Sequence, residues 1–428
     1  MTTKTVPFSE AQIREIIAEH PTPFHLYDEA AIRAFARQFC GHFVDSGLTG
    51  YRNYFAVKAL PNPSIMEILM HEGMGFDCSS LAELLLCERI GAHCETLPNG
   101  LPRIMFTSNE TPYQEYQKAV ELGAIINLDD ITHIPYFAQY VGAFPALMSF
   151  RYNPGPQRSF SKRNDFIIGN PEEAKFGMTR EQLYEGYRML KERGVREFGL
   201  HTMVASNEIV AEAFVETARM LLELVADLSR QLDIHFRFIN LGGGFGVSYR
   251  PEENPLDIAD IAGHVRDLYA EMIADNGLPD LDIVTENGRI ATGPHGYLVT
   301  TVRHTKDIYR KYLGVDATMA NLMRPGMYGA YHHISVMGKD PDGETEIYDV
   351  VGSLCENNDK FAVQRELPVA GPGDVLIIHD SGAHGHAMGF NYNGKLRAAE
   401  LLLEPDGGTR LIRRAETLDD LFRTLELD

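Results

Sequence analysis

The chain has 428 residues, too many for one ordinary compact core, so two domains are expected. Its composition, with 44% hydrophobic and 23% charged residues, is typical of a folded globular protein. The formal net charge is −21, which argues against nucleic acid and anionic membranes as partners, because both bind basic surfaces.

The N-terminal segment and the cysteines indicate a cytoplasmic protein. MTTKTVPFSEAQ lacks the apolar region of a signal peptide, and no stretch of about 20 residues is apolar and uncharged, as a membrane span requires. The five cysteines form no CxxC pair, so neither a disulfide framework nor a bound metal is expected. Each thiol except that of Cys355 is expected to be a small buried hydrophobe.

Short apolar runs alternate with amphipathic runs over the first two thirds of the chain. Apolar stripes over residues 32–43 and 214–228 have the spacing of a helix face. Pro61 and Pro63 fit the loop and the first turn of another helix. The short runs, expected as strands, are Tyr54–Lys58, Gly75–Ser79, Ile104–Thr107, Ala124–Leu128, Ala146–Tyr152, Glu197–Val204, His235–Leu241 and Asp282–Glu286.

Eight strands that alternate with helices favour a closed, TIM-like β/α barrel, which we place at residues 30–290. A doubly wound open sheet is the alternative. In such a barrel, functional side chains gather at the C-terminal ends of the strands. The residues so placed are Lys58, Asp77, His201, Glu286 and the glycine run that follows Leu241.

The pattern changes after about residue 295, where short runs rich in β-forming residues are separated by turn residues. We expect a mostly antiparallel β domain formed by residues 291–428 together with residues 1–29. The segment ETLDDLFRTLEL near the C-terminus predicts a helix. The expected strands are GYLVTTV, YHHISVM, TEIYDVV, DVLIIHD, AAELLLE and TRLIRR.

Two motifs in the barrel have the chemistry of a covalent cofactor site. Lys58 ends the first predicted strand, within YFAVKAL and among apolar neighbours, where lost solvation lowers the pKa of an amine and favours Schiff-base formation. The alternative is a lysine that reaches solvent from a strand end. Leu241-Gly-Gly-Gly-Phe-Gly246 follows a strand and could present backbone N–H groups to a phosphate, or could be a tight turn.

Three further motifs carry charged or nucleophilic side chains. In Glu286-Asn-Gly-Arg289, the carboxylate could pair with a protonated pyridine nitrogen and the arginine with a phosphate or carboxylate. In Arg324-Pro-Gly-Met-Tyr328, the guanidinium and the phenol could together bind a carboxylate. Cys355-Glu356 could combine a proton donor with an amine-binding group. The alternative for each is ordinary loop structure.

The order of these motifs along the chain resembles that of a known class of enzymes. The landmarks are YFAVKAL, GFDCSSLAEL, RYNPG, KFG, NLGGGFGVSY, ENGR, LMRPGMYGAYHHI, VVGSLCENND, HDSGAHG and NYNGKLRAAELLL. They are similar to the alanine-racemase-like pyridoxal-phosphate enzymes and, within the decarboxylase branch, to the diaminopimelate decarboxylases. The likeness runs from TPFHLYD near the start to the terminal LIRRAET.

The resemblance implies a pyridoxal 5′-phosphate site in the barrel. Lys58 would hold the cofactor as a Schiff base, and Glu286 would pair with the pyridine nitrogen. Gly242, Gly243 and Gly244, together with Ser206, would bind the phosphate. The implied cofactor-binding residues are Lys58, His201, Met203, Ser206, Gly242, Gly243, Gly244, Glu286, Gly288, Arg289 and His384.

The resemblance also implies a homodimer whose active sites are shared between subunits. Cys355, as proton donor, and Glu356, which contacts the distal amine, would reach into the partner's barrel. The implied substrate-binding residues are Arg289, Arg324, Tyr328, Glu356 and His384. The expected reaction is decarboxylation of meso-diaminopimelate to L-lysine and CO2 through an imine with the cofactor.

The charges of the implied residues match this substrate. Two arginines beside Glu356 suit a small-molecule amino acid with both a distal carboxylate and a distal amine. Two positions differ from the family pattern. Met203 stands where a histidine usually stacks on the cofactor, and His384 stands where a tyrosine is usual. We hypothesise that His384 takes the role of that phenol.

Three alternatives stay open. The same scaffold could decarboxylate another amino acid or a carboxylated polyamine. A catalytically dead regulatory homologue would have lost Lys58, Glu286 or Cys355, and all three are present. An unrelated barrel enzyme could instead hold a phosphorylated metabolite on the glycine run.

Overall fold

The structure is a computed structural model that describes residues 4–157 and 172–426. Its contacts divide the chain into two compact units. One, called here the barrel unit, comprises residues 33–246 and 255–288. The other, called the β unit, comprises residues up to 32, residues 247–254 and residues from 289 onward.

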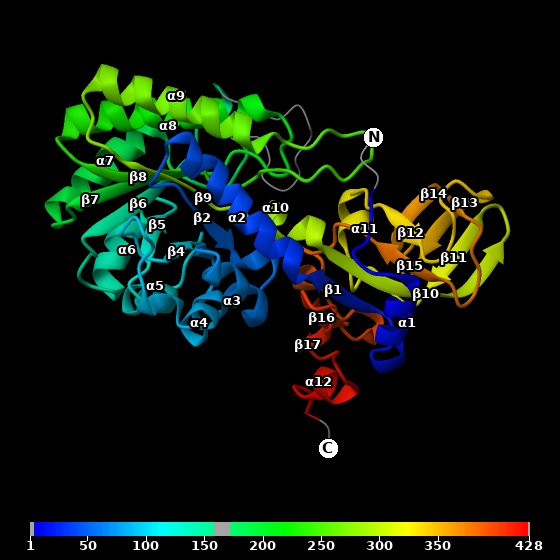
Figure 1. Ribbon diagram of the computed structural model, residues 1–428. Helices are drawn as coiled ribbons and strands as arrows, with labels where there is room; N and C mark the ends of the chain where they lie inside the picture. The colour runs from blue at the N-terminus through cyan, green and yellow to red at the C-terminus, as the bar shows by residue number, and fades with distance from the viewer. Residues whose placement is uncertain (1–3, 158–171, 427–428) are drawn as a thin grey trace. The chain divides into compact units, whose positions relative to one another are not determined.

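Eight parallel strands close the barrel unit, and the predicted barrel is confirmed (Figure 1). Each strand pairs with the next in chain order, and the first pairs with the last. The strands are β2 (Arg52–Ala56), β3 (Gly75–Cys78), β4 (Ile104–Thr107), β5 (Ile125–Leu128), β6 (Leu147–Tyr152), β7 (Glu197–Thr202), β8 (Phe236–Asn240) and β9 (Asp282–Thr285).

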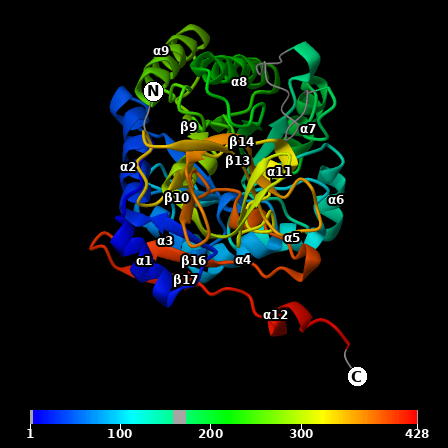
Figure 2. The ribbon, with the colours of Figure 1, turned by 90° about the vertical axis from the view of Figure 1, so that its right-hand side faces the viewer.

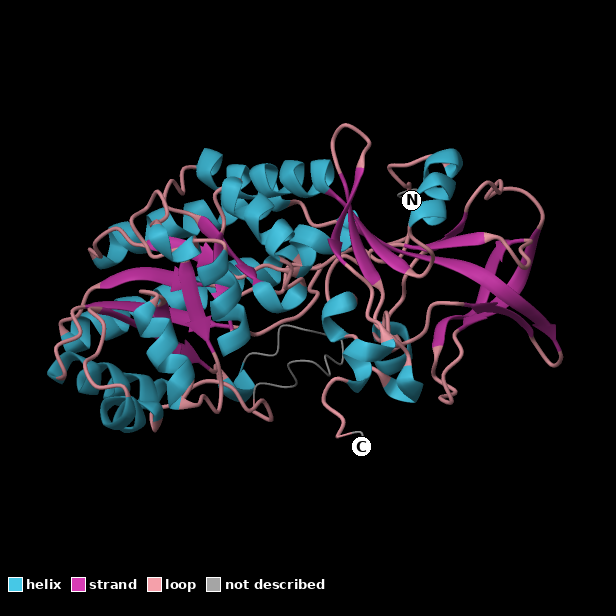
Figure 3. Ribbon diagram, turned by 90° about the horizontal axis from the view of Figure 1, so that it is seen from below, coloured by secondary structure: helices cyan, strands magenta, loops and turns pink. Residues whose placement is uncertain are grey.

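Helices surround these strands, as Figure 3 shows for the magenta strands and cyan helices of the barrel unit. The predicted stripe over 32–43 lies on α2 (Glu29–Ser46), and that over 214–228 lies on α8 (Ala211–Leu232). Asn62 caps α3 (Pro63–His71), whose first turn holds the predicted proline. The other helices are α4 (Leu81–Arg89), α5 (Tyr113–Glu121), α6 (His133–Tyr140), α7 (Arg180–Glu192) and α9 (Ile258–Asn276), with 3₁₀ turns Val57–Ala59, Ala92–Cys94 and Gly155–Gln157.

A mixed sheet of mostly antiparallel strands forms the β unit, which confirms the second predicted architecture. β13 and β14 are paired antiparallel neighbours (Figure 2), whereas β1–β16 and β11–β13 are parallel pairs. The strands are β1 (Phe24–Asp28), β10 (Gly296–Asp307), β11 (Lys311–Val315), β12 (Ile334–Val336), β13 (Thr345–Val351), β14 (Lys360–Pro368), β15 (Val375–Ile378), β16 (Ala399–Leu403) and β17 (Thr409–Arg413).

The β unit contains elements that the sequence pattern did not indicate. Strands β1, β11 and β14 were not predicted, nor was the N-terminal helix α1 (Glu10–Glu19). The helix predicted near the C-terminus is only the five residues of α12 (Leu418–Phe422). The remaining short helices are α10 (Arg289–Thr292), α11 (Arg324–Tyr328) and the 3₁₀ turns Gly293–His295, His386–Met388 and Tyr392–Gly394.

Two further observations concern the cysteines and the membrane. Cys78 and Cys87 are buried and Cys40 is half-buried, but Cys94 is exposed, so its predicted burial is wrong. Cys94 ends a surface 3₁₀ turn, where no apolar neighbours enclose it. In the described ranges, no helix combines the length and apolarity that a bilayer span requires.

Candidate active site

Lys58 projects from a turn immediately after β2. The strand ends at Ala56, and Lys58 lies in the 3₁₀ turn that follows, so the predicted strand-end position is shifted by one short turn. Its ammonium donates a hydrogen bond to Asp77 Oδ2 across 3.2 Å, and its side chain is 52% exposed. The carboxylate raises the pKa of Lys58 against the opposing effect of burial, so the lowered pKa expected from apolar neighbours is wrong.

Asp77 is the buried partner of this lysine. It lies on β3 and is 1% exposed, and burial together with the charge of Glu286 raises its pKa. Within the described part of the chain, Asp77 Oδ1 has no hydrogen-bond partner. A buried carboxylate therefore lies in hydrogen-bond contact with the amine that the sequence predicted to hold the cofactor.

A second buried carboxylate, Glu286, follows β9 and has two side-chain partners. His201 Nε2 lies 3.0 Å from Oε2, and Asn240 Nδ2 donates to Oε1 across 2.7 Å. Burial by itself raises the pKa of Glu286, but His201, Lys58 and Asn240 outweigh burial and lower the pKa. An ionised carboxylate is thus held at the C-terminal end of the barrel strands, with the second ring nitrogen of His201 lacking a partner among described residues.

The glycine run after β8 forms a close-packed backbone loop. A Cβ at Gly243 would lie 2.4 Å from the Glu286 carbonyl oxygen, and one at Gly244 would lie 2.4 Å from that of Ala205. Gly242 and Gly244 also have positive φ angles, which side chains disfavour. The backbone N–H of Gly243 donates to the sulfur of Met203 at 3.2 Å, so the sulfur contacts the predicted phosphate loop.

The remaining predicted barrel residues lie around this loop. Ser206 is next to Ala205, in the segment that packs on Gly244, and the backbone N–H of Glu208 donates to the Gly244 carbonyl. Gly288 is buried, and a Cβ there would lie 2.7 Å from Ala59 Cβ, in the turn that carries Lys58. The loop after β9 thus packs on the loop after β2.

In the β unit, the two predicted arginines lie around one tyrosine. Arg289 Nη1 donates to the hydroxyl of Tyr249 across 3.1 Å. The guanidinium carbon of Arg324 lies 5.8 Å from the centroid of the same ring. The arginines are 8% and 6% exposed, so both cations are buried in one cluster.

Cys355 and Glu356 begin a loop that is organised by Asp359. Asp359 accepts hydrogen bonds from the backbone N–H groups of Met319 at 2.6 Å and Leu354 at 2.8 Å. Cys355 is exposed, and its N–H donates to Asn393 Oδ1 at 2.6 Å. Glu356 is exposed as well and accepts a bond from the Asn358 N–H at 3.0 Å.

This loop packs against the helix that carries the second arginine. A Cβ at Gly326 in α11 would lie 2.3 Å from the Asn358 carbonyl oxygen, which explains the glycine in the Arg-Pro-Gly sequence. Tyr328, at the end of α11, is 39% exposed. His384 lies in the loop after β15 with a φ of 54°, and its neighbour Ala383 would lie 3.7 Å from a Cβ at Gly293.

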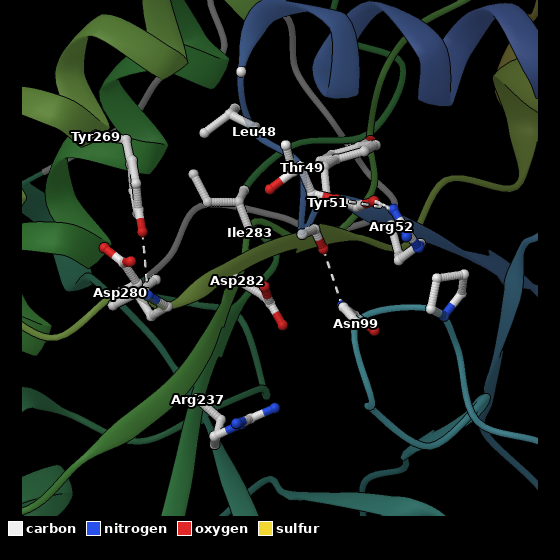
Figure 4. A pocket seen from close by; sticks show the side chains of 14 residues that line it. Leu48, Thr49, Tyr51, Arg52, Asn99, Arg237, Tyr269, Asp280, Asp282 and Ile283 are labelled. Atoms are coloured by element: carbon white, nitrogen blue, oxygen red, sulfur yellow. Dashed lines mark hydrogen bonds between the residues drawn. The ribbon is translucent and has the colours of Figure 1, made fainter.

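A cavity of about 510 Å³ lies at the other end of the barrel strands (Figure 4). Its walls include Arg52, Arg237 and Asp282, which stand at the N-terminal ends of β2, β8 and β9. Lys58 and Glu286 follow the C-terminal ends of β2 and β9, so this cavity is separate from the candidate site.

The sequence prediction missed several residues of the site. Asn240 ends β8, and the same strand-end rule that marked His201 would have found it. Arg151 lies near the end of β6, with its guanidinium carbon 4.3 Å from the centre of the Phe176 ring. Tyr249 had no local signal, because its partners are 40 and 75 residues away along the chain.

Comparison with known proteins identifies the family. A family profile described as "Pyridoxal-dependent decarboxylase, pyridoxal binding domain" matches residues 33–293, which is more than half of the chain. The chain belongs to the pyridoxal-dependent decarboxylases. This pyridoxal-dependent decarboxylase is therefore a carboxy-lyase whose cofactor is pyridoxal phosphate, as the sequence predicted.

Relatives that match this decarboxylase over nearly its whole length include diaminopimelate decarboxylases and a protein with another name. Protein TabA of Pseudomonas amygdali pv. tabaci is 43% identical over 97% of this chain and 95% of its own. Diaminopimelate decarboxylase of Methanothermobacter thermautotrophicus is 33% identical over 96% of this chain and 92% of its own. The crystal structure of the diaminopimelate decarboxylase from M. jannaschii has a TM-score of 0.87 and 27% identity, covering 97% and 94% of the two chains.

The residues of the decarboxylase fit the cofactor. An amine, an ionised carboxylate and a backbone loop without side chains converge at the C-terminal ends of the barrel strands. These are the groups required by an aldehyde, a pyridine nitrogen and a phosphate, respectively. His201 Nδ1 and Asp77 Oδ1 are buried without a hydrogen-bond partner among the described residues, so both could bond to a group bound at the same place.

Proposed function

We propose that this decarboxylase converts meso-diaminopimelate to L-lysine and CO2. The observation that carries the proposal is the buried pair Arg289 and Arg324, which share Tyr249 in the β unit. A decarboxylase for a simple diamino acid has no use for two cations beside the substrate tail. A distal carboxylate matches them, because guanidinium groups bind carboxylates in a bidentate manner.

In this proposal, the barrel unit holds the cofactor. Lys58 would bind the aldehyde of the cofactor, Gly242, Gly243 and Gly244 with Ser206 would hold its phosphate, and Glu286 would pair with its pyridine nitrogen. When bound, pyridoxal phosphate supplies an electron-accepting ring for the electron pair that remains after CO2 leaves. The low pKa of Glu286 keeps its carboxylate ionised, and an ionised carboxylate holds a proton on the pyridine nitrogen. His201 and Asn240 fix the orientation of that carboxylate.

The β unit supplies substrate contacts and a proton. Arg289, Arg324 and Tyr328 bind the distal carboxylate, Glu356 binds the distal ammonium, and the Cys355 thiol donates a proton to Cα. Exposure of Cys355 and Glu356 in the single chain supports their use by a second subunit. We therefore propose a homodimer in which these two residues complete the partner's site. A cytoplasmic location, expected from the sequence, stays a prediction.

A second candidate function is decarboxylation of a different amino acid that also carries a distal carboxylate. Two observations favour this second candidate function. The identity to TabA, at 43%, exceeds the 33% identity to the diaminopimelate decarboxylase of M. thermautotrophicus. In addition, Met203 and His384 stand at positions where the resemblance leads us to expect histidine and tyrosine.

The deciding experiment compares CO2 release by the purified holoenzyme from meso-diaminopimelate, L-lysine and L-ornithine. The proposal predicts turnover of meso-diaminopimelate alone. Turnover of only L-lysine or L-ornithine would overturn the carboxylate assignment and retain the cofactor chemistry. No turnover of any of the three would favour the second candidate and lead to other dicarboxylic amino acids.

A further inference from the structure

Tyr249 lies between the two arginines that the proposed function assigns to the substrate tail. It belongs to the segment 247–254, which groups with the β unit although it follows the glycine loop of the barrel. Its side chain is buried, at 6% exposure. Tyr249 ends the landmark NLGGGFGVSY, but the sequence assigned it no role, and only the structure shows its contacts with the arginines.

The hydroxyl group of Tyr249 contacts one arginine, and its aromatic ring contacts the other. The hydroxyl oxygen accepts the hydrogen bond from Arg289 Nη1 at 3.1 Å. The ring lies under the guanidinium of Arg324, at 5.8 Å from its centroid to the guanidinium carbon. A neutral phenol can do both at once, because its oxygen is an acceptor and its ring carries negative potential on the face.

His332 holds the ring from another side. The two rings meet edge to face with centroids 5.1 Å apart, and His332 Nδ1 donates to the His379 carbonyl at 2.8 Å. Burial lowers the pKa of His332 to about 3, and the nearby arginines act in the same direction. The imidazole is therefore neutral at physiological pH and adds no third cation to the cluster.

Tyr249 contacts both guanidinium groups and is itself contacted by His332, so it holds the two arginine side chains in a defined orientation. A carboxylate that arrives then finds two cations already oriented, which reduces the cost of ordering them.

We propose that Tyr249 is the positioning residue that orients Arg289 and Arg324 and thereby selects amino acids with a distal carboxylate. This inference rests on the proposed function, because it assumes that both arginines contact the substrate tail. Tyr249 acts through the arginines and takes no part in the bond-breaking step. Its loss therefore weakens binding of the distal carboxylate and leaves the chemistry at Cα nearly unchanged.

Two variants separate the two contacts of Tyr249. Tyr249→Phe keeps the ring and removes the acceptor, whereas Tyr249→Gln keeps an oxygen acceptor and removes the ring. Tyr269→Phe is the matched control, because its hydroxyl also accepts one hydrogen bond, from the Leu281 N–H at 3.1 Å, beside the separate cavity of Figure 4. Cofactor absorbance and thermal unfolding establish that each variant is folded holoenzyme.

The readouts are KM and kcat for meso-diaminopimelate and the inhibition constant of pentane-1,5-diamine, which has an amine at each end and no carboxylate. We expect Tyr249→Phe to raise KM about tenfold, the loss of one hydrogen bond from a charged donor, with kcat within about twofold. Tyr249→Gln should raise KM as well. The inhibition constant of pentane-1,5-diamine should stay within about twofold in both variants, and Tyr269→Phe should behave as wild type.

Three results would contradict the inference. An unchanged KM in both Tyr249 variants of an enzyme that turns over meso-diaminopimelate overturns the inference and leaves the proposed function standing. Equal losses for meso-diaminopimelate and pentane-1,5-diamine would show a general structural role and overturn it too. A wild-type enzyme that does not turn over meso-diaminopimelate overturns the proposed function and this inference together.

Discussion

The ammonium of Lys58, on the turn after β2, donates a hydrogen bond to Oδ2 of Asp77 on β3 across 3.2 Å. This pairing raises the pKa of the amine that the family chemistry requires in its neutral form. The carboxylate therefore affects how readily the cofactor aldehyde can react with the chain.

Replacement of Asp77 should change the pH dependence of cofactor uptake. In Asp77→Asn the main cause of the raised Lys58 pKa is gone, so more free amine exists at each pH. We expect the midpoint of cofactor association to move to lower pH in stopped-flow absorbance measurements on the apoenzyme. Glu72→Gln, which removes a carboxylate bound to Arg33 and Arg37, is the control. A midpoint that stays in place or rises would contradict the role of Asp77.

The glycine loop should tolerate no side chain at Gly243. Alanine there would bring Cβ to within 2.4 Å of a backbone carbonyl that has no freedom to move away, so we expect at least tenfold weaker cofactor binding by equilibrium titration. Gly263→Ala in α9 is the matched control, since no atom lies within 4 Å of the added carbon. Alanine in a helix should leave binding unchanged and stabilise the fold by about 0.5–1 kcal/mol. Equal binding by both variants would remove the loop from the cofactor site.

Glu286→Gln should reduce turnover without loss of cofactor binding. A neutral amide does not keep the pyridine nitrogen protonated, so we expect kcat to fall at least a hundredfold while cofactor absorbance persists. Asp282→Asn changes a carboxylate at the other end of the same strand and should leave kcat within about twofold. Retention of full activity by Glu286→Gln would refute the assigned role.

Mixed subunits test whether active sites are shared. Lys58→Ala and Cys355→Ala homodimers should each be inactive, the second with its cofactor still bound. After random exchange, half of the dimers contain both variants, and each of these has one intact site if Lys58 and Cys355 act across subunits. Recovery of about a quarter of wild-type activity is therefore expected, and a mixture that stays inactive would contradict the shared site.

Acid stability of the β unit should depend on Glu400. Burial by itself raises the pKa of this carboxyl, but His386, Arg413 and the Tyr27 hydroxyl outweigh it and lower the pKa from 4.5 to about 2. The ionised group therefore stabilises the fold above pH 4.5, and this contribution is lost as pH falls toward 2.

Glu400→Gln leaves Arg413 without its buried partner and should cost about 3 kcal/mol at pH 7. In chemical denaturation, the difference from wild type should shrink as pH falls from 4.5 toward 2. Glu404→Gln, which disrupts a more exposed pair with Arg410, should change little. A pH-independent difference would contradict the linkage.

The barrel was predictable because its eight strands are short, mostly buried runs that alternate with amphipathic helices. That same regularity predicts the strand ends, and hence that Lys58, Asp77, His201 and Glu286 share one edge of the barrel. The β unit was harder, because strands such as β11 and β14 are partly exposed and mix charged with apolar residues.

Two features of the site were beyond local sequence patterns. The sign of the Lys58 pKa shift depends on a 3.2 Å contact that opposes burial, and a pattern of apolar neighbours shows only the burial. The cluster of Tyr249, Arg289 and Arg324 joins three segments that no periodicity connects. Such clusters require the tertiary fold.

The central claim is that this enzyme removes one carboxylate from meso-diaminopimelate through chemistry at Lys58. The most direct measurement follows purified holoenzyme and substrate by NMR, with CO2 measured in parallel and Lys58→Ala as the control. We predict L-lysine and CO2 in equal amounts from the wild type and neither from the variant. Absence of L-lysine from the wild type, or its continued formation by Lys58→Ala, would contradict this account.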